Sequence, residues 1–315
     1  MTASTSSAGS EALRSATAAR VVRRDVVTAA GPDARTYLQG QCSQDLDGLG
    51  VGESIESLVL SPQGKVDAYV RVTRTADDAF VLDTDEGCGA DLLARLLRFR
   101  LRVAVDLEQV DWACLALRGP AAVAPAAPGA PGGPVLAAPV TWPGWSGVDL
   151  LGPTPADDPE LATWLPDGAV RCDAEAWDAA RIEAGVPVGG REVTGSTIAA
   201  EAGLVDRTVS FTKGCFTGQE LVARLDSRGS NVARHLRGVV VADGARPPVG
   251  AAVWTADGAH EVGALSSVAW SAARGATVAL ATLQRRVVPP EPVVVRWDST
   301  EAAAEAYPLP LTDAG

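Results

Sequence analysis

The pattern that most constrains the fold is a series of short strand-like segments in the last quarter of the chain. From about Leu236 onward, five such segments cover residues 237–241, 251–255, 262–268, 277–283 and 293–297. Asp257-Gly258, between the second and third segments, is a dipeptide typical of two-residue hairpins. Several short strands with turns between them and no helical periodicity are typical of a small closed sheet. We therefore expect residues 236–310 to form an antiparallel β-barrel.

The preceding region, residues 19–235, mixes strand and helix patterns. Residues 21–27 predict a strand, 33–39 a short helix, and 55–60 with 66–72 a hairpin around Pro62-Gln63-Gly64. Residues 91–99 place four leucines on one helical face, and residues 177–182 predict another helix. The Ala-, Pro- and Gly-rich stretch 120–139 predicts a flexible connection. The fold class expected for the whole chain is α+β.

Composition and charge exclude several classes of function. The chain has 315 residues, of which 47% are hydrophobic, and a formal net charge of −12. No apolar run approaches the roughly 20 residues that a membrane-spanning helix needs, so no membrane partner is expected. Because nucleic-acid binding depends on neutralising phosphates, the negative charge argues against a nucleic-acid partner. Residues 1–18 lack the basic start and apolar core of a secretory signal and predict a disordered tail.

The five cysteines are dispersed along the chain, with no Cys-x-x-Cys pair. An odd, scattered set without a secretory signal predicts reduced thiols and a cytoplasmic protein. The two histidines, His235 and His260, stand in no ligand-like spacing, so the sequence predicts no metal site. Four cysteines are expected in the core, because a free cysteine usually packs as a small hydrophobe; these are Cys42, Cys88, Cys114 and Cys172.

The fifth cysteine, Cys215, lies in the segment Lys-Gly-Cys-Phe-Thr-Gly-Gln-Glu, residues 213–220. Residues 208–211 alternate polar and apolar as a strand does, and Thr217 with Glu220 forms a capping box, which predicts a helix beginning at Thr217. A nearby ammonium group and the free amides of a helix start would both lower the pKa of the Cys215 thiol. Lys213, one of two lysines in a chain rich in arginine, is the expected cation. Cys215 is therefore a candidate reactive thiol assisted by Lys213, and the alternative is a small buried side chain beside an ordinary cap.

This eight-residue segment resembles the signature of the YgfZ family of folate-binding proteins, relatives of the glycine-cleavage T-protein. Segments 31–40, 61–65 and 181–185 resemble family segments in the same order, and the resemblance covers about residues 20–310. It implies a T-protein-like multi-module folate-binding fold, with two intertwined modules in residues 19–235 followed by the barrel. It also implies tetrahydrofolate, or a one-carbon-substituted derivative, as the cofactor.

The resemblance further implies that carboxylates hold the pterin ring of the folate, whose donor edge suits a charged acceptor. Asp67, Glu183 and Glu201 are the candidates, and Lys65 and Arg224 are further candidate folate contacts. Each acid could instead be a solvated surface residue, as most Asp and Glu side chains are. A basic run could bind the carboxylates of the folate tail or could stabilise the C-terminal end of its own helix; it comprises Arg95, Arg98, Arg100 and Arg102.

The expected activity departs from that of the T-protein. Aminomethyltransferases of this type carry adjacent acids after the glycine turn, whereas this chain has Asp67 followed by Ala68. The function expected is a tetrahydrofolate-binding accessory protein that supports assembly or repair of iron–sulfur proteins through Cys215. Its partners would be iron–sulfur client or assembly proteins, and whether it turns over a substrate is left open. Two alternatives remain: a folate-dependent one-carbon transferase that uses Asp67 as its acid/base group, and a folate-independent iron–sulfur scaffold or carrier.

Overall fold

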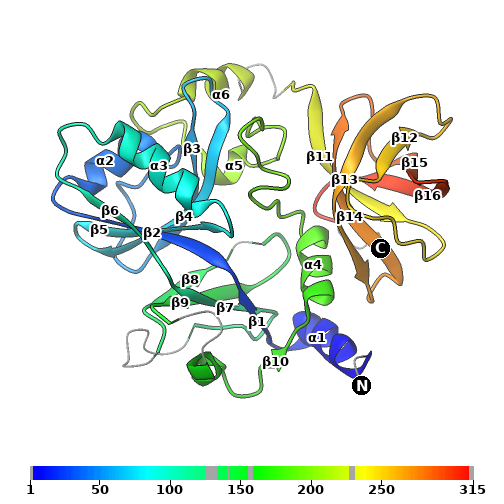
Figure 1. Cartoon of the computed structure of the whole chain (residues 1–315), viewed down its shortest axis with the longest axis horizontal. Coiled ribbons are helices and arrows are strands. Elements are labelled where there is room, and N and C mark those ends of the chain that lie inside the picture. Colours follow the sequence, from blue (N-terminus) through cyan, green and yellow to red (C-terminus); the bar gives the residue numbers. More distant parts are fainter. Residues whose placement is uncertain (1–2, 125–132, 141, 155–158, 227–230, 312–315) are drawn as a thin grey trace.

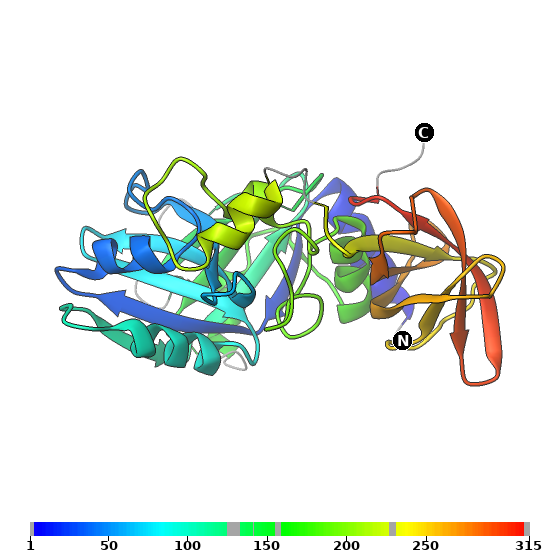
Figure 2. The ribbon, with the colours of Figure 1, turned by 90° about the horizontal axis from the view of Figure 1, so that it is seen from above.

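The computed structural model describes residues 3–124, 133–140, 142–154, 159–226 and 231–311 of the chain. The chain forms two five-stranded sheets and a closed six-stranded barrel. Figure 1 shows the sheets on one side of the molecule and the barrel on the other. Helix α4 (Ala174–Glu183) lies between them, and Figure 2 shows the same arrangement from above. The α+β class and the C-terminal antiparallel barrel, both predicted from the sequence, are confirmed.

The first sheet has the strand order β3-β4-β5-β2-β6 and is antiparallel throughout. Its β3–β4 hairpin is the one that the Pro-Gln-Gly turn predicts. Helices α2 and α3 cover one face because Leu38, Leu92 and Leu96 are buried against the strands, whereas Leu97, expected on the same face, is 43% exposed. The bounds are β2 Arg24–Ala30, α2 Ala34–Gln41, β3 Ser54–Leu60, β4 Val66–Ala76, β5 Ala79–Asp85, α3 Gly89–Phe99 and β6 Asp106–Val110.

The second sheet has the order β10-β1-β7-β9-β8, with a parallel pair only between β1 and β10. The bounds are β1 Ala18–Val22, β7 Ala113–Arg118, β8 Leu136–Pro139, β9 Gly147–Gly152 and β10 Val170–Arg171. The apolar alternation of residues 21–27 predicts one strand, but Arg23 separates β1 from β2. These consecutive strands pair in different sheets, so the segment around Arg23 crosses from one sheet to the other.

Two segments expected to lack order contain regular structure. Residues 3–15, within the predicted disordered tail 1–18, form helix α1 (Ala3–Ser15). That expectation is wrong for these residues because Ala12 and Leu13 are buried beside Trp177 of α4, which gives the helix a partner that composition does not reveal. In the predicted flexible stretch 120–139, residues 136–139 form β8. The central part of that stretch, residues 125–132, lies outside the described residues.

The barrel closes in the order β11-β14-β13-β12-β15-β16 around an apolar interior that includes Val239, Val253 and Val295. The sequence pattern predicts five of its strands and misses β16, which is rich in Ala and Glu and so has weak strand propensity. Strand β16 pairs with both β11 and β15 and thereby closes the barrel. The bounds are β11 Arg234–Val241, β12 Ala252–Thr255, β13 Glu261–Ser271, β14 Ala276–Gln284, β15 Glu291–Trp297 and β16 Thr300–Tyr307.

Helix α4 connects the barrel to the rest of the molecule. Ala179 and Ile182 pack against Leu236, Val278 and Leu280 on the outer face of the barrel. The opposite side of the helix therefore remains available to face the two sheets. The remaining helices are η1 Pro159–Trp164, α5 Val205–Thr208 and α6 Gln219–Asp226. None of the described helices has the length and apolar content that a membrane crossing needs.

Candidate functional site

A cavity of about 410 Å³ lies where the two sheets meet α4 and the segment that follows it. Its walls come from both sheets, from α4 and from residues 186–191. The described lining contains seven arginines and five carboxylates, together with Tyr69, Trp142 and Trp177. Cavities of this size with aromatic walls and a few fixed polar groups are typical of small-molecule sites. The cavity is therefore the first candidate site.

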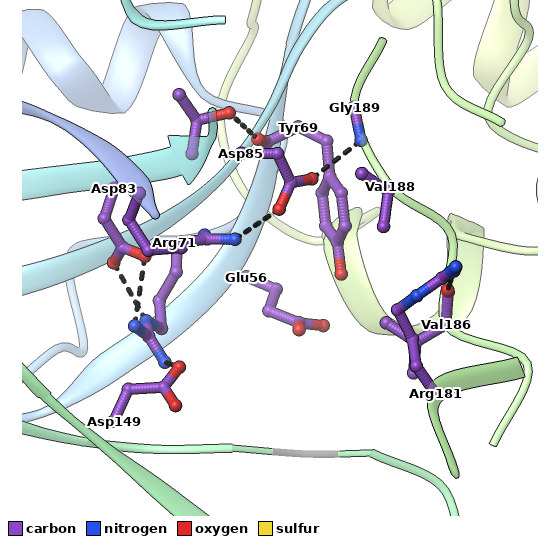
Figure 3. A network of polar contacts seen from close by, with 12 residues as sticks. Glu56, Tyr69, Arg71, Asp83, Asp85, Asp149, Arg181, Val186, Val188 and Gly189 are labelled. Atoms are coloured by element: carbon purple, nitrogen blue, oxygen red, sulfur yellow. Dashed lines mark hydrogen bonds and ion pairs between the residues drawn. The ribbon is translucent and has the colours of Figure 1, made fainter. Parts of the chain in front are cut away.

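A buried network of arginines and aspartates forms one wall of the cavity (Figure 3). Arg71 of β4 donates Nε and Nη2 to the two oxygens of Asp83, at 2.9 and 3.0 Å, and Nη1 to Asp149 of β9 at 2.8 Å. Arg118 of β7 donates to the other oxygen of Asp149 at 2.7 Å. Arg24 of β2 binds Asp83 as well, at 2.7 Å. Because these pairs join strands of both sheets, the network fixes the sheets relative to each other.

Asp149 carries the strongest electrostatic consequence of this arrangement. Burial opposes its ionisation, but the charges of Arg118 and Arg71 outweigh burial and lower the pKa of Asp149 to about 2. The carboxylate is therefore ionised throughout the physiological range. A charge this deeply buried is tolerated only because both of its oxygens are paired.

Asp85 extends the network to the segment after α4. Its Oδ1 accepts from Arg24 at 2.5 Å, and its Oδ2 accepts from the backbone amide of Gly189 at 2.7 Å. Arg181 of α4 fixes the same segment by donating Nη1 to the carbonyl of Val186 at 2.8 Å (Figure 3). Residues 186–189 are thus attached both to the first sheet and to α4, and they form a defined wall of the cavity.

Tyr69 and Glu56 supply a second polar wall (Figure 3). Glu56 is held by Arg207 through two hydrogen bonds of 2.6 Å, and Arg207 also donates to the Tyr69 hydroxyl at 3.0 Å. Burial, followed by the nearby Glu56 carboxylate, raises the pKa of Tyr69. The hydroxyl therefore stays protonated.

A second feature lies outside the cavity, where the segments quoted for the family resemblance meet. A side chain on Gly218 would place its Cβ 2.5 Å from the carbonyl of Ser61 and 3.2 Å from Gly64, and Gly218 has a φ of +81°. The turn 61–65 and the loop before α6 therefore pack backbone against backbone, which only glycine permits. A hydrogen bond from the amide of Thr217 to the carbonyl of Gly40 joins the loop to a third segment.

Lys213 fixes this loop in place. Its ammonium donates to the carbonyls of Gln39, Cys42 and Gln44 at 2.6, 2.7 and 2.9 Å. An ammonium group has three hydrogens, so all of them are engaged by the last turn of α2 and the segment that follows it. Burial lowers the pKa of Lys213. The expected pairing of this cation with the Cys215 thiol is therefore not what the structure shows, and three convergent carbonyls explain why a compact ammonium stands here.

Cys215 is exposed on this loop. The predicted helix start at Thr217 is wrong, because α6 begins at Gln219 and the side chain of Gln219 accepts from the amide of Phe216 at 3.1 Å. Cys215 therefore stands four residues before the helix and not at its free amides. Residues 208–211, expected as a strand, form the end of α5 and an irregular segment. The thiol owes its accessibility to the loop geometry.

The other cysteines agree with the core expectation in three of four cases. Cys42, Cys114 and Cys172 are buried, and Cys88 is half-buried before α3. Burial raises the pKa of Cys42 to about 11 and of Cys172 to about 12. Cys215 is thus the one exposed thiol among the cysteines, all five of which are described.

The cavity does not gather the residues selected from the sequence. Its described lining excludes all of them, namely Lys65, Asp67, Glu183, Glu201, Lys213, Cys215 and Arg224. Asp67 is paired with Arg95 at 2.9 Å. Glu183 is buried between Arg14 of α1 and Ser271 of the barrel, at 2.6 and 2.5 Å.

The remaining selected residues lie around the second feature or on the surface. Glu201 is half-buried, and its backbone carbonyl accepts from the amide of Leu236 at 2.7 Å where β11 begins. Lys65 is exposed and its backbone bridges to Ile198. Arg224 is exposed on α6. The basic run also lies away from the cavity: Arg95 stacks on Phe99 at 3.8 Å in addition to its pair with Asp67.

Sequence reasoning overlooked the cavity residues, although a sign of them was present. Arg118 ends a strand that is otherwise wholly apolar, and Arg71 stands between two valines of β4. A cation in such a strand predicts a buried ion pair, since an arginine is almost never buried alone. No comparable sequence feature predicts that Trp142, Trp177 and Asp178 line the cavity, because their position there depends on how α4 packs.

Comparison with known proteins agrees with this fold. The family model described as the GCVT N-terminal domain matches residues 20–127. Proteins named tRNA-modifying protein YgfZ are similar to the chain: that of Klebsiella pneumoniae (strain 342) is 29% identical and that of Yersinia pestis (strain Pestoides F) 28%, each over 65% of this chain. The match spans 66% of each relative, slightly less than two thirds of its length. The crystal structure of the glycine cleavage system aminomethyltransferase T from Bartonella henselae superposes with a TM-score of 0.79 at 20% identity, covering 97% of this chain and 89% of that one.

The chain resembles the YgfZ family. Its sequence relatives carry that name, and its fold is shared with an aminomethyltransferase T. The cavity described above lies at the junction of the two sheets and is lined by polar and aromatic groups. The cavity and the Cys215 loop are separate features of this fold, since the described lining of the cavity does not include Cys215.

Substitution of Lys213 should destabilise the folded protein. Substituting Lys213 with Met should lower the free energy of unfolding by roughly 1.5–3 kcal/mol, because hydrogen bonds from a charged donor to three carbonyls are lost. Lys213→Arg should also destabilise, since a planar guanidinium does not fit three carbonyls that converge on one point. Chemical denaturation measures both. Lys65→Met, at the exposed second lysine, is the matched control, and equal midpoints for Lys213→Met and Lys65→Met would show that the Lys213 bonds contribute nothing.

Proposed function

We propose that the chain is a tetrahydrofolate-binding accessory protein that supports the assembly or repair of iron–sulfur proteins through Cys215. The cavity at the junction of the two sheets carries the folate part of this proposal, because it offers both a flat aromatic wall and fixed polar groups. A reduced pterin presents hydrogen-bond donors and an acceptor on a flat ring, and the folate tail is anionic. Tyr69, Trp142 and the cavity arginines suit such a ligand.

Asp178 is the cavity carboxylate best suited to the donor edge of a pterin. Glu56, Asp85 and Asp149 already accept hydrogen bonds on both oxygens. The fifth cavity carboxylate, Glu86, has a side chain that is 65% exposed and lies beside Arg23. Asp178 accepts only on Oδ1, from Arg181 at 3.1 Å, and the described part of the chain supplies no partner for Oδ2. It stands on α4, which packs firmly against the barrel, so its position is fixed.

Calorimetric titration with tetrahydrofolate tests this assignment. We expect Asp178→Asn to weaken binding by about 1.5–3 kcal/mol, which is the contribution of a hydrogen bond to a charged acceptor. Glu201→Ala, at an acid outside the cavity, is the control and should leave the affinity unchanged. If Glu201→Ala weakens binding and Asp178→Asn does not, the pterin is held by the acid that the family resemblance suggests. Absence of binding to the unaltered protein would end the folate proposal.

The accessory role is favoured over the two alternatives. Under the transferase reading Asp67 would act as the acid/base group, but it is paired with Arg95 and lies outside the cavity lining. A scaffold that holds a cluster alone would need several thiols together, whereas the five cysteines lie on different elements and one of them is exposed. A single exposed thiol suits transient contact with a client.

The name of the relatives, tRNA-modifying protein, is compatible with this role. A chain with a net charge of −12 does not attract RNA by bulk electrostatics. Support of an iron–sulfur enzyme that itself modifies tRNA would link the name to the proposed function without direct RNA binding. The intracellular setting that this role requires agrees with the reduced state of the thiols.

A further inference from the structure

Arg118 has an unpartnered edge at the cavity. The residue is 3% exposed, and its Nη1 donates to the carbonyl of Leu117 at 2.9 Å and to Asp149 at 2.7 Å. In the described chain neither Nε nor Nη2 has a hydrogen-bond acceptor, and Nε is enclosed. A buried donor without an acceptor is destabilising, so in native proteins such a group is usually completed by a ligand or an ordered water. The Nε–Nη2 edge is also the one that presents two parallel N–H groups to an oxygen acceptor.

Two tryptophans fix the orientation of this guanidinium. Its Cζ lies 4.4 Å from the ring centroid of Trp142 and 5.0 Å from that of Trp177. The two indoles meet edge to face, with centroids 5.6 Å apart. All three residues line the cavity. The two indoles therefore fix the orientation of the Arg118 guanidinium before a ligand enters.

Charge balance decides what kind of acceptor fits. The buried network pairs three arginines with three aspartates, namely Arg24, Arg71 and Arg118 with Asp83, Asp85 and Asp149. An additional carboxylate at this depth would be uncompensated, which is costly in a buried site. A neutral carbonyl oxygen can accept from Arg118 without disturbing that balance. The exposed cavity arginines, Arg23 and Arg191, are better placed for a charged tail.

We propose that the Nε–Nη2 edge of Arg118 binds the ring carbonyl at position 4 of the pterin and thereby selects 4-oxo pterins against 4-amino pterins. This inference rests on the proposed folate binding and goes beyond it by assigning the specificity-determining residue. A 4-amino ring presents N–H donors at the same position, so donor would face donor. The discrimination arises because the site leaves polar groups unpaired with the wrong ring.

The test compares tetrahydrofolate with its 4-amino counterpart, and a tail-free tetrahydropterin with p-aminobenzoylglutamate, by calorimetry. The unaltered protein should bind tetrahydrofolate at least about tenfold more tightly than the 4-amino compound. The Arg118→Lys variant keeps a cation beside Asp149 and the two indoles but lacks the paired N–H groups of the guanidinium. This substitution should lower the affinity for tetrahydrofolate and for tail-free tetrahydropterin about ten- to a hundredfold. The affinities for the 4-oxo and the 4-amino compounds should then become similar. Arg246→Lys, at an arginine that stacks on Trp270 outside the cavity, is the matched control.

Each outcome separates this inference from the proposed function. If the unaltered protein binds the 4-oxo and 4-amino compounds equally well, the inference is wrong and folate binding stands, a result that needs no variant. If Arg118→Lys weakens p-aminobenzoylglutamate and spares the tail-free pterin, Arg118 contacts the tail and the inference is also wrong. If neither folate compound binds, the proposed function fails and the inference fails with it.

Discussion

Cys215→Ser should abolish the ability of the chain to restore iron–sulfur enzyme activities in a strain that lacks it, while leaving folate affinity and thermal stability unchanged. The thiol is exposed on a loop that other residues hold, so exchanging sulfur for oxygen removes no packing. The hydroxyl lacks the nucleophilic and metal-binding capacity of a thiolate. A loss of function without a loss of stability would therefore assign the chemistry to the sulfur atom.

Two controls sharpen this experiment. Cys88→Ser changes a half-buried cysteine, whose pKa is raised by burial and by nearby Asp85, and should complement fully. With limiting iodoacetamide, mass spectrometry should find Cys215 labelled before the other four cysteines because they are wholly or partly covered. Asp67→Asn should keep activity under the accessory role and lose it under the transferase role. Full complementation by Cys215→Ser together with an inactive Asp67→Asn protein would favour the one-carbon enzyme.

Asp149→Ala should lower the free energy of unfolding by about 3–5 kcal/mol, the largest stability effect expected in this chain. Removing the carboxylate leaves Arg71 and Arg118 buried without one of their partners. Urea denaturation at neutral pH measures the loss. Asp77→Ala removes an acid that is 92% exposed and pairs with one arginine at 3.1 Å, and it should change stability by less than about 1 kcal/mol. Similar losses in both variants would show that burial of the pair is unimportant.

The same carboxylate predicts a pH dependence. Its pKa is depressed from 3.8 to about 2 in the folded protein, because Arg118 and Arg71 outweigh the opposing effect of burial. The stabilisation is therefore complete above the unfolded value near pH 4 and is lost as the pH falls toward 2, a change of about 2–3 kcal/mol. Asp149→Asn should lack this part of the acid transition. An unchanged acid profile in Asp149→Asn would show that other carboxylates control acid unfolding.

Local patterns predicted those elements whose partners lie nearby in the chain. The β3–β4 hairpin follows from its turn and alternation, and five barrel strands follow from the same period. Strand β16 and helix α1 were not predicted because their composition favours no particular structure. Pairing with β11 and β15 stabilises β16, and packing against α4 stabilises α1. The prediction that a helix begins at Thr217 is wrong because the side chain of Gln219, and not that of Thr217, accepts a hydrogen bond from a backbone amide.

The sequence by itself indicated the resemblance to the YgfZ family and the C-terminal barrel, because each is encoded in contiguous residues or in short turns. The tertiary structure alone decided the cavity. Arg71, Arg118, Asp149 and Asp178 are far apart in the chain, and their meeting depends on β1 and β2 pairing in different sheets and on how α4 packs against the barrel. No local pattern records that placement, since it arises from the burial of apolar faces and the pairing of charges between distant elements.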